Sequence, residues 1–330
     1  MCIVYGMRMR RLSIKGADAA YHCMSRTVNG SIFFKNREKE VLRKMIWQIA
    51  DFSGVELLTY SIMGNHFHVL VRVPYVTSVS DVELMRRYRT LYPAPTKYET
   101  ASIGVLESQL KANGEAAKAI RARLMARMHD VSMFMKTLKQ RFSIWYNKNH
   151  DRYGPLWSDR FKSVLVEGKD FSLQTMAAYI DLNAVRGGLV KDPKDYRFCG
   201  YAEAVAGNSL AKSGLASVVG NVSAMENYRT LLYGKGAFPG GDGAAGFPEA
   251  AISKVLTEQQ GALSAAVVLR CRVRYFTEGA VFGTAEFVRG FVNEVQRNRY
   301  RKRAPALHPL EGDGLNHLAV IGGGRRRRMD

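Results

Sequence analysis

Two histidines separated by a single apolar residue, His66 and His68, lie inside the strand-like run from Asn65 to Val71. Side chains alternate between the two faces of a strand, so both imidazoles share one face, about 7 Å apart. At that separation they can bind one divalent cation between them. A half-buried pair of structural histidines has the same pattern, and the spacing alone does not decide between the two.

A second pair of polar side chains lies further along the chain, where Tyr179 precedes Asn183 by four residues in a helix expected over about 171–183. Positions i and i+4 share one helix face, so the phenol and the carboxamide project together. The Asn183 oxygen could complete a metal site begun by the two histidines. The Tyr179 phenol, with an ordinary pKa near 10, would need such a cation to act as a nucleophile on a phosphate ester. The alternative is a half-buried helix tyrosine beside a hydrogen-bonded asparagine.

Other residue types compatible with this chemistry are more ambiguous. Tyr146 is an alternative nucleophile, although packing or base stacking is the simpler role, and His22 is expected to be structural or to lie near the site. Trp145 and Trp157 could stack on unpaired bases or pack in the core. Three basic residues near these positions could contact phosphates, and the alternative is ordinary solvated charge: Arg160, Lys162 and Arg186.

The elements that must position these residues follow from apolar periodicity and turn residues. Strands are expected over about 17–28, 57–63 and 66–73, with a helix from Asn36 to Gly54 between the first two and Pro74 ending the third. A helix over 132–147, a short strand over 161–166 and the helix carrying Tyr179 follow. This order predicts an α+β fold, a ferredoxin-like antiparallel β-sheet covered by helices, with a mostly helical C-terminal region.

Composition divides the chain into four expected regions. Residues 1–205 form the core domain, in which 75–130 are a charged, partly helical insertion interrupted by Pro93 and Pro95. Residues 206–248 are expected to be a glycine-rich linker region, and 249–304 to be helical. The helical region could resemble a helix-turn-helix DNA reader or, equally, contact phosphates without reading sequence. Residues 305–330 are a basic tail, expected to be disordered. The basic residues expected to bind DNA in the C-terminal region are Arg297, Arg299, Arg301, Lys302 and Arg303.

The charge of the chain favours a polyanionic partner. Lys and Arg outnumber Asp and Glu by 49 to 29, which gives a net charge of +20. The four cysteines are far apart, no signal peptide is recognisable, and no apolar run is long enough to span a bilayer. We therefore expect a cytoplasmic, nucleoid-associated protein.

Three ordered blocks, at 64–71, 154–161 and 179–190, resemble the signature blocks of single-tyrosine HUH transposases, and most nearly those of the REP-associated tyrosine transposases. The residues at 192–201 also resemble that branch, and the resemblance covers about 12–205. Ala184 departs from the proline that usually follows the asparagine, and Gly64 replaces a frequent proline before the histidines. Neither departure removes a catalytic group, but both alter local rigidity.

The resemblance implies an HUH endonuclease fold and a metal-dependent nuclease that nicks and rejoins single-stranded or hairpin DNA. His66 and His68 would hold Mg²⁺ or Mn²⁺, Asn183 would be the third ligand, and Tyr179 would form a 5′-phosphotyrosine intermediate. Such a protein would act as a monomer or homodimer without a membrane. The competing interpretation is a domesticated, catalytically inactive DNA-binding protein. An RNA-binding protein would account for the charge but not for the blocks.

Overall fold

The computed structural model describes Ile14, residues 16–220, Tyr228, Arg229, Leu232 and Phe276, and then residues 279–291, 307–309 and 318–322. None of their helices is long and apolar enough to cross a bilayer.

The first half of the chain is a βαββαβ unit with a ferredoxin-like strand order, which confirms the predicted α+β class. The β-sheet runs in the order β2-β3-β1-β4 through this unit, and each neighbouring pair is antiparallel. The strand β3 that carries both histidines lies directly between β2 and β1. The elements are β1 (Ala19–Arg26), α1 (Asn36–Ser53), β2 (Glu56–Ile62), β3 (His66–Val73), α5 (Val131–Asn149) and β4 (Lys162–Val166).

The termini of these elements follow the expected turn chemistry. Gly54 ends α1 in the left-handed conformation, with φ of 61°, as a helix C-terminal glycine should. The turn between β2 and β3 closes with a hydrogen bond from the Met63 N–H to the His66 carbonyl at 2.8 Å. Pro74 follows the last residue of β3, where it cannot continue the strand hydrogen bonds. The predicted bounds of β3, 66–73, are confirmed.

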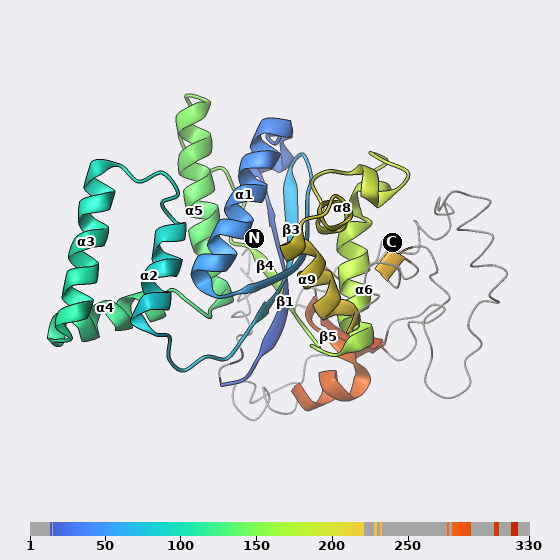
Figure 1. Ribbon diagram of the computed structural model, residues 1–330. Helices are drawn as coiled ribbons and strands as arrows, with labels where there is room; N and C mark the ends of the chain where they lie inside the picture. The colour runs from blue at the N-terminus through green and yellow to red at the C-terminus, as the bar shows by residue number, and fades with distance from the viewer. Residues whose placement is uncertain are drawn as a thin grey trace, which may run out of the picture.

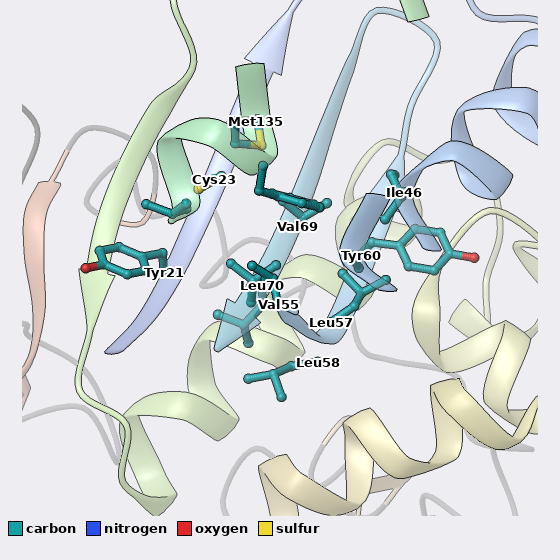
Figure 2. Packing of buried hydrophobic residues seen from close by; sticks show 14 of the residues in the cluster. Tyr21, Cys23, Ile46, Val55, Leu57, Leu58, Tyr60, Val69, Leu70 and Met135 are labelled. Atoms are coloured by element: carbon teal, nitrogen blue, oxygen red, sulfur yellow. The ribbon is translucent and has the colours of Figure 1, made fainter. Parts of the chain in front are cut away.

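Helices cover both faces of the sheet. In Figure 1, α1 and α5 lie on one side of the strands, and α6 (Asp170–Asp181), α8 (Gly200–Val205) and α9 (Ser209–Val219) lie on the other. Figure 2 shows Cys23 and Val69, which are paired across β1 and β3, close to Met135 of α5. All three side chains are fully buried. This face is a closed apolar core, so chemistry must take place on the other face.

The expected insertion is helical and peripheral. It contains α2 (Asp81–Thr90), α3 (Lys97–Ala112) and α4 (Glu115–Met125), and Figure 1 shows all three outside α1 and α5, away from the sheet. Pro93 and Pro95 fall between α2 and α3, as predicted. Arg121 of α4 pairs with Asp81 of α2 at 2.7 Å, so the insertion is linked internally by charge as well as by apolar contacts.

Part of the expected glycine-rich linker region is a helix. Residues 209–219 form α9, which begins with the Asn208 side chain accepting the Ala211 N–H and buries Leu215 against the sheet. Gly214 explains the tight packing, because an added Cβ there would lie 2.5 Å from the Leu57 carbonyl oxygen of β2. Gly214 is thus a helix–strand contact point rather than part of a linker.

The C-terminal part of the sheet corrects two further expectations. The described C-terminal residues include three strands in a region predicted to be helical and then disordered: β5 (Gly279–Thr284), β6 (Leu307–Pro309) and β7 (Leu318–Gly322). They extend the sheet as β4-β5-β7-β6, with β5 parallel to β4. Within the region 249–304 that was expected to be helical, residues 285–291 do form a helix, and the Thr284 hydroxyl accepts the Phe287 N–H at 3.2 Å. The rest of 249–304, with its helix-turn-helix expectation, lies outside the described residues.

Candidate active site

The face of the sheet beneath α6 carries the two histidines together with side chains from β1 and β4. Directly opposed residues of antiparallel strands share a face, and Met24 is opposed to His68 on one side and Lys162 on the other. By the same register Arg26 is opposed to His66. His66 and His68 therefore share a face with cationic side chains of β1 and of the next strand, β4.

The helix α6 positions Tyr179 over this face. The Tyr179 ring centroid lies 6.0 Å from the ring of His68 and 6.0 Å from that of His22, in edge-on orientation to both. The helix is shorter than predicted, because α6 ends at Asp181 and a four-residue helix α7 begins at Asn183. Asn183 is nevertheless buried and forms a hydrogen bond with the His66 side chain. The phenol and the carboxamide therefore both meet the histidine pair, as the i, i+4 spacing predicts.

His22 belongs to the same cluster. Its Nε2 lies 2.8 Å from His68 Nδ1, and its Nδ1 lies 2.8 Å from the Phe276 carbonyl oxygen. The His22 and His68 rings are stacked, with centroids 5.0 Å apart, and only 1–2% of either residue is exposed. The Phe276 ring also contacts Tyr179, with a centroid distance of 4.5 Å. The C-terminal region thus reaches the site through Phe276.

All three histidines of the cluster are held neutral at physiological pH. Burial lowers the pKa of His22 and of His66 to about 4, and burial places the pKa of His68 well below its ordinary value. The positive charge of Arg186 lowers the pKa of each of the three further. Each ring therefore has one protonated nitrogen and one nitrogen with a lone pair.

Arg186 lies against the ring of the candidate nucleophile. Its Cζ lies 3.8 Å from the centroid of the Tyr179 ring, within cation–π range. Arg186 is half-buried, and it ends α7, seven residues after Tyr179. A guanidinium here can contact the oxygens of a phosphate placed at the Tyr179 hydroxyl.

A buried carboxyl group anchors α6 between the tyrosine and the asparagine. The Asp181 carboxylate accepts hydrogen bonds from the Thr59 hydroxyl at 2.8 Å, the Tyr228 hydroxyl at 2.5 Å and the Tyr201 N–H at 3.2 Å. Burial nevertheless raises the pKa of Asp181 to about 6, against these hydrogen bonds. Three separate segments thus fix the end of the helix that carries Tyr179.

The remaining predicted residues fall into three groups. Arg160 and Lys162 are exposed at the start of β4, near the site face. Tyr146 is 5% exposed and packs against Phe142 and His150 on α5, on the opposite side of the sheet from the histidine pair. Trp145 and Trp157 are half-buried. The five predicted residues of the C-terminal helix lie outside the described residues: Arg297, Arg299, Arg301, Lys302 and Arg303.

Two site residues were missed by sequence reasoning. Arg26 is exposed, lies directly across from His66, and its charge contributes to the lowered pKa of that histidine. The even spacing of His22, Met24 and Arg26 along β1 was the available signal. Phe276 had no sequence signal, because it meets Tyr179 and His22 only through long-range packing.

The donor set fits a divalent cation that accepts both nitrogen and oxygen ligands. His66 and His68 are neutral imidazoles, and Asn183 supplies a neutral carboxamide oxygen beside them. Among the described residues, no three histidine, cysteine or acidic side chains gather as a metal centre. A third protein ligand from the described residues is therefore expected to be an amide rather than a carboxylate.

One segment of the chain matches a known protein family. Residues 16–92 match the family described as "Transposase IS200 like", which confirms the resemblance drawn from the sequence blocks over this segment. The matched segment contains β1, β2 and the histidine pair of β3, and it ends before the blocks at 154–161 and 179–190. No curated protein matches the chain.

A solved structure matches as well, that of a REP-associated tyrosine transposase bound to a REP hairpin. The match covers 61% of this chain and 86% of that chain, with 15% identity and a TM-score of 0.37.

Proposed function

We propose that this chain is a metal-dependent transposase that nicks and rejoins single-stranded or hairpin DNA through a 5′-phosphotyrosine intermediate. The observation that carries the proposal is the placement of the Tyr179 ring, 6.0 Å from the His68 ring and 3.8 Å from the Arg186 guanidinium. A nucleophile, a pair of neutral imidazoles and a cation thus meet on one face of the sheet. The match of residues 16–92 to IS200-like transposases supports the same reaction class.

The reaction is a transesterification. The Tyr179 oxygen forms a bond to the phosphorus of a DNA phosphodiester, and the bond from phosphorus to the 3′ oxygen breaks. The phenol proton passes to solvent, and the departing 3′ oxygen takes up a proton to become a hydroxyl. Because one ester replaces another, the reverse attack by a 3′ hydroxyl can rejoin the strand without an external energy source.

The side chains of the site have separable roles. His66, His68 and Asn183 would hold Mg²⁺ or Mn²⁺, which polarises the phosphate and stabilises charge developing on it. Arg186 orients the phosphate and offsets its charge beside the phenol. Arg26 at the end of β1, and Arg160 and Lys162 at the start of β4, contact phosphates of the DNA strand. Asp181 holds α6 in position without touching the substrate.

The proposal is tested with end-labelled single strands that tile both DNA flanks of the gene, incubated with protein and Mg²⁺ or Mn²⁺ and run on denaturing gels. Wild type should give a slow, protease-sensitive band, and Tyr179→Phe should give none. Tyr146→Phe is the matched control, because it removes the same hydroxyl from the other face of the sheet, and it should retain the band. Strands that bind tightly without any adduct would instead identify a DNA-binding protein without turnover.

The cation is tested separately. His66→Ala combined with His68→Ala should abolish cleavage while most of the DNA affinity remains, since the double substitution removes none of the basic side chains expected to contact phosphates. Chelation of divalent cations should have the same effect on wild type. Cleavage that survives both treatments would refute the role of the histidine pair.

A further inference from the structure

Each candidate metal ligand on β3 makes a hydrogen bond through its Nδ1 to one neighbouring side chain, and each neighbour is held in turn by a backbone carbonyl. His68 contacts His22, which contacts the Phe276 carbonyl. His66 contacts Asn65, which contacts the Gly30 carbonyl. These contacts form two hydrogen-bond chains, one ending at the Phe276 carbonyl and one at the Gly30 carbonyl. A carbonyl oxygen can only accept a hydrogen bond, so each of the two carbonyls fixes the position of every proton in its hydrogen-bond chain.

The first chain begins at Phe276. Its carbonyl accepts, so His22 Nδ1, 2.8 Å away, must carry the proton and donate. His22 is 1% exposed and its second ring nitrogen faces another buried imidazole rather than a carboxylate, so its Nε2 has the lone pair and accepts. The donor to that lone pair is His68 Nδ1, also at 2.8 Å. His68 is 2% exposed, and a proton on its other nitrogen as well would place a positive charge in this buried position, so its Nε2 is left without a proton.

The second chain begins at Gly30, in the turn after β1. Its carbonyl accepts from the amide nitrogen of Asn65 at 2.8 Å, which fixes the orientation of that carboxamide. The Asn65 oxygen therefore faces His66 Nδ1 at 2.6 Å, and the imidazole donates. His66 Nε2 is left without a proton. Asn183 is compatible with this arrangement, because a carboxamide offers both a donor and an acceptor.

We infer that His22 and Asn65 are positioning residues that fix the proton on Nδ1 of His68 and His66, so that Nε2 of both rings is ready to bind a cation. The inference rests on the proposed function only for the identity of what binds; the proton positions follow from the hydrogen bonds. A histidine ligand usually donates its second ring nitrogen to such a partner, which fixes the ring and its tautomer. His22 lies 46 residues from its histidine and Asn65 is adjacent to its own, so two unrelated devices give one result.

This arrangement also gives the C-terminal region a role in the site. The Phe276 carbonyl fixes the proton positions of His22 and His68. Phe276 lies well outside the segment similar to IS200-like transposases, which ends at residue 92. His22 is 1% exposed, so water does not readily replace that carbonyl as the acceptor. The tautomer of His68 therefore depends on the contact between His22 and Phe276, which are 254 residues apart in the sequence.

The experiment reads tautomers directly, by two-bond ¹H–¹⁵N NMR of the cation-free protein with labelled histidine. The chain has seven histidines, and single substitutions assign their signals. In wild type, His66 and His68 should both carry the proton on Nδ1. His22→Phe should convert His68 to a mixture with the proton on Nε2 and leave His66 unchanged. Asn65→Leu should do the reverse.

Three further variants or readouts separate positioning from folding. His129→Phe, which removes a half-buried imidazole beside Arg87, should change neither tautomer. His22→Gln keeps one donor and one acceptor and should restore the Nδ1 proton of His68. Mn²⁺ affinity, measured by electron paramagnetic resonance, should fall about 10- to 100-fold in His22→Phe and in Asn65→Leu.

The possible results separate this inference from the proposed metal-dependent function. A proton on Nε2 of His68 in wild type, or equal changes at both rings in both variants, would overturn the inference. Nδ1 protons with the crossed response to the two variants would support it. If those tautomers are found in a protein that binds no Mn²⁺ with or without DNA, the inference stands and the metal-dependent function fails.

Discussion

Replacing Asp181 by asparagine should change the pH dependence of stability, because this carboxyl group is buried at the end of the helix that carries Tyr179. Burial raises its pKa from 3.8 to about 6. A folded-state pKa above the unfolded value means that the folded protein binds the proton more tightly. The stability contributed by this proton is present in full below about pH 3.8 and is lost as the pH rises through 6.

The magnitude follows from the shift. About two pKa units correspond to about 3 kcal/mol between the acid and the neutral limits. The asparagine side chain of the Asp181→Asn variant would stay neutral at every pH and would keep acceptors for the Thr59 hydroxyl and the Tyr201 N–H. The free energy of unfolding of wild type, minus that of the variant, should therefore fall by about 2–3 kcal/mol between about pH 4 and pH 7.

The assay is urea unfolding of wild type and of Asp181→Asn at steps of half a pH unit across that range. The difference between their free energies of unfolding cancels the contributions of the other titrating groups, which the two proteins share. Glu83→Gln is a control of opposite sign, because Arg86 and Arg87 lower the pKa of Glu83 to about 2. A difference between wild type and Asp181→Asn that does not vary with pH would refute the reasoning. It would mean that the three hydrogen bonds to Asp181 fully offset the loss of hydration.

Three other predictions concern the packing and the charge of the chain. Gly214→Ala should lower the free energy of unfolding by about 1–3 kcal/mol, since the added Cβ would meet the backbone of β2. Gly104→Ala is the control, because the added Cβ has open space on α3 and should raise the melting temperature slightly. Tyr228→Phe removes a 2.5 Å hydrogen bond from Asp181, so it should cost about 1–3 kcal/mol at pH 7 and move the titration of Asp181 to higher pH in the same unfolding series. Neutralising the four arginines at 325–328 should reduce the salt dependence of single-strand affinity by about 0.7 logarithmic units per lost phosphate contact, measured by fluorescence anisotropy, and a change limited to sequence preference would contradict this.

The first four strands and their helices could be predicted because their signals are local. In β3, an apolar run beginning at His66 ends at Pro74, and in α1 the apolar spacing ends at Gly54. Turn residues and periodicity are set by neighbours within a few positions, which a single sequence contains. The cluster of His66, His68, Tyr179 and Asn183 followed from the same local geometry together with the resemblance to known blocks.

The strands β5 to β7 could not be predicted, because their pairing is non-local. The strand β5 begins at Gly279 and contains Gly283, residues that are typical of turns rather than strands. Gly283 is explained only by the tertiary structure, since an added Cβ would lie 2.8 Å from Glu167 Cβ. The Glu167 carboxylate also accepts the Thr284 N–H at 2.7 Å, which joins the end of β4 to β5 across 117 residues.

His22 shows the same limit within the site itself. Its place on β1 and its even spacing from Arg26 put it on the correct face, but periodicity cannot show which nitrogen donates or to what. The partner, the Phe276 carbonyl, is 254 residues away and belongs to the backbone, where residue type leaves no trace. A sequence can thus identify the ligands of a site while leaving their proton positions to the tertiary structure.

The charge distribution of the candidate site fits the proposed substrate, a DNA strand. Its candidate ligands are two neutral imidazoles and an amide, and the charged side chains around them, Arg26, Lys162 and Arg186, are cations. The Asp181 carboxyl group lies between Tyr179 and Asn183 in the sequence, but it is buried and accepts hydrogen bonds from Thr59, Tyr201 and Tyr228. A site of this kind offers little negative charge of its own to a divalent cation. On the proposed function the phosphates of a DNA strand would supply that charge, so the strand and the cation should each strengthen the binding of the other.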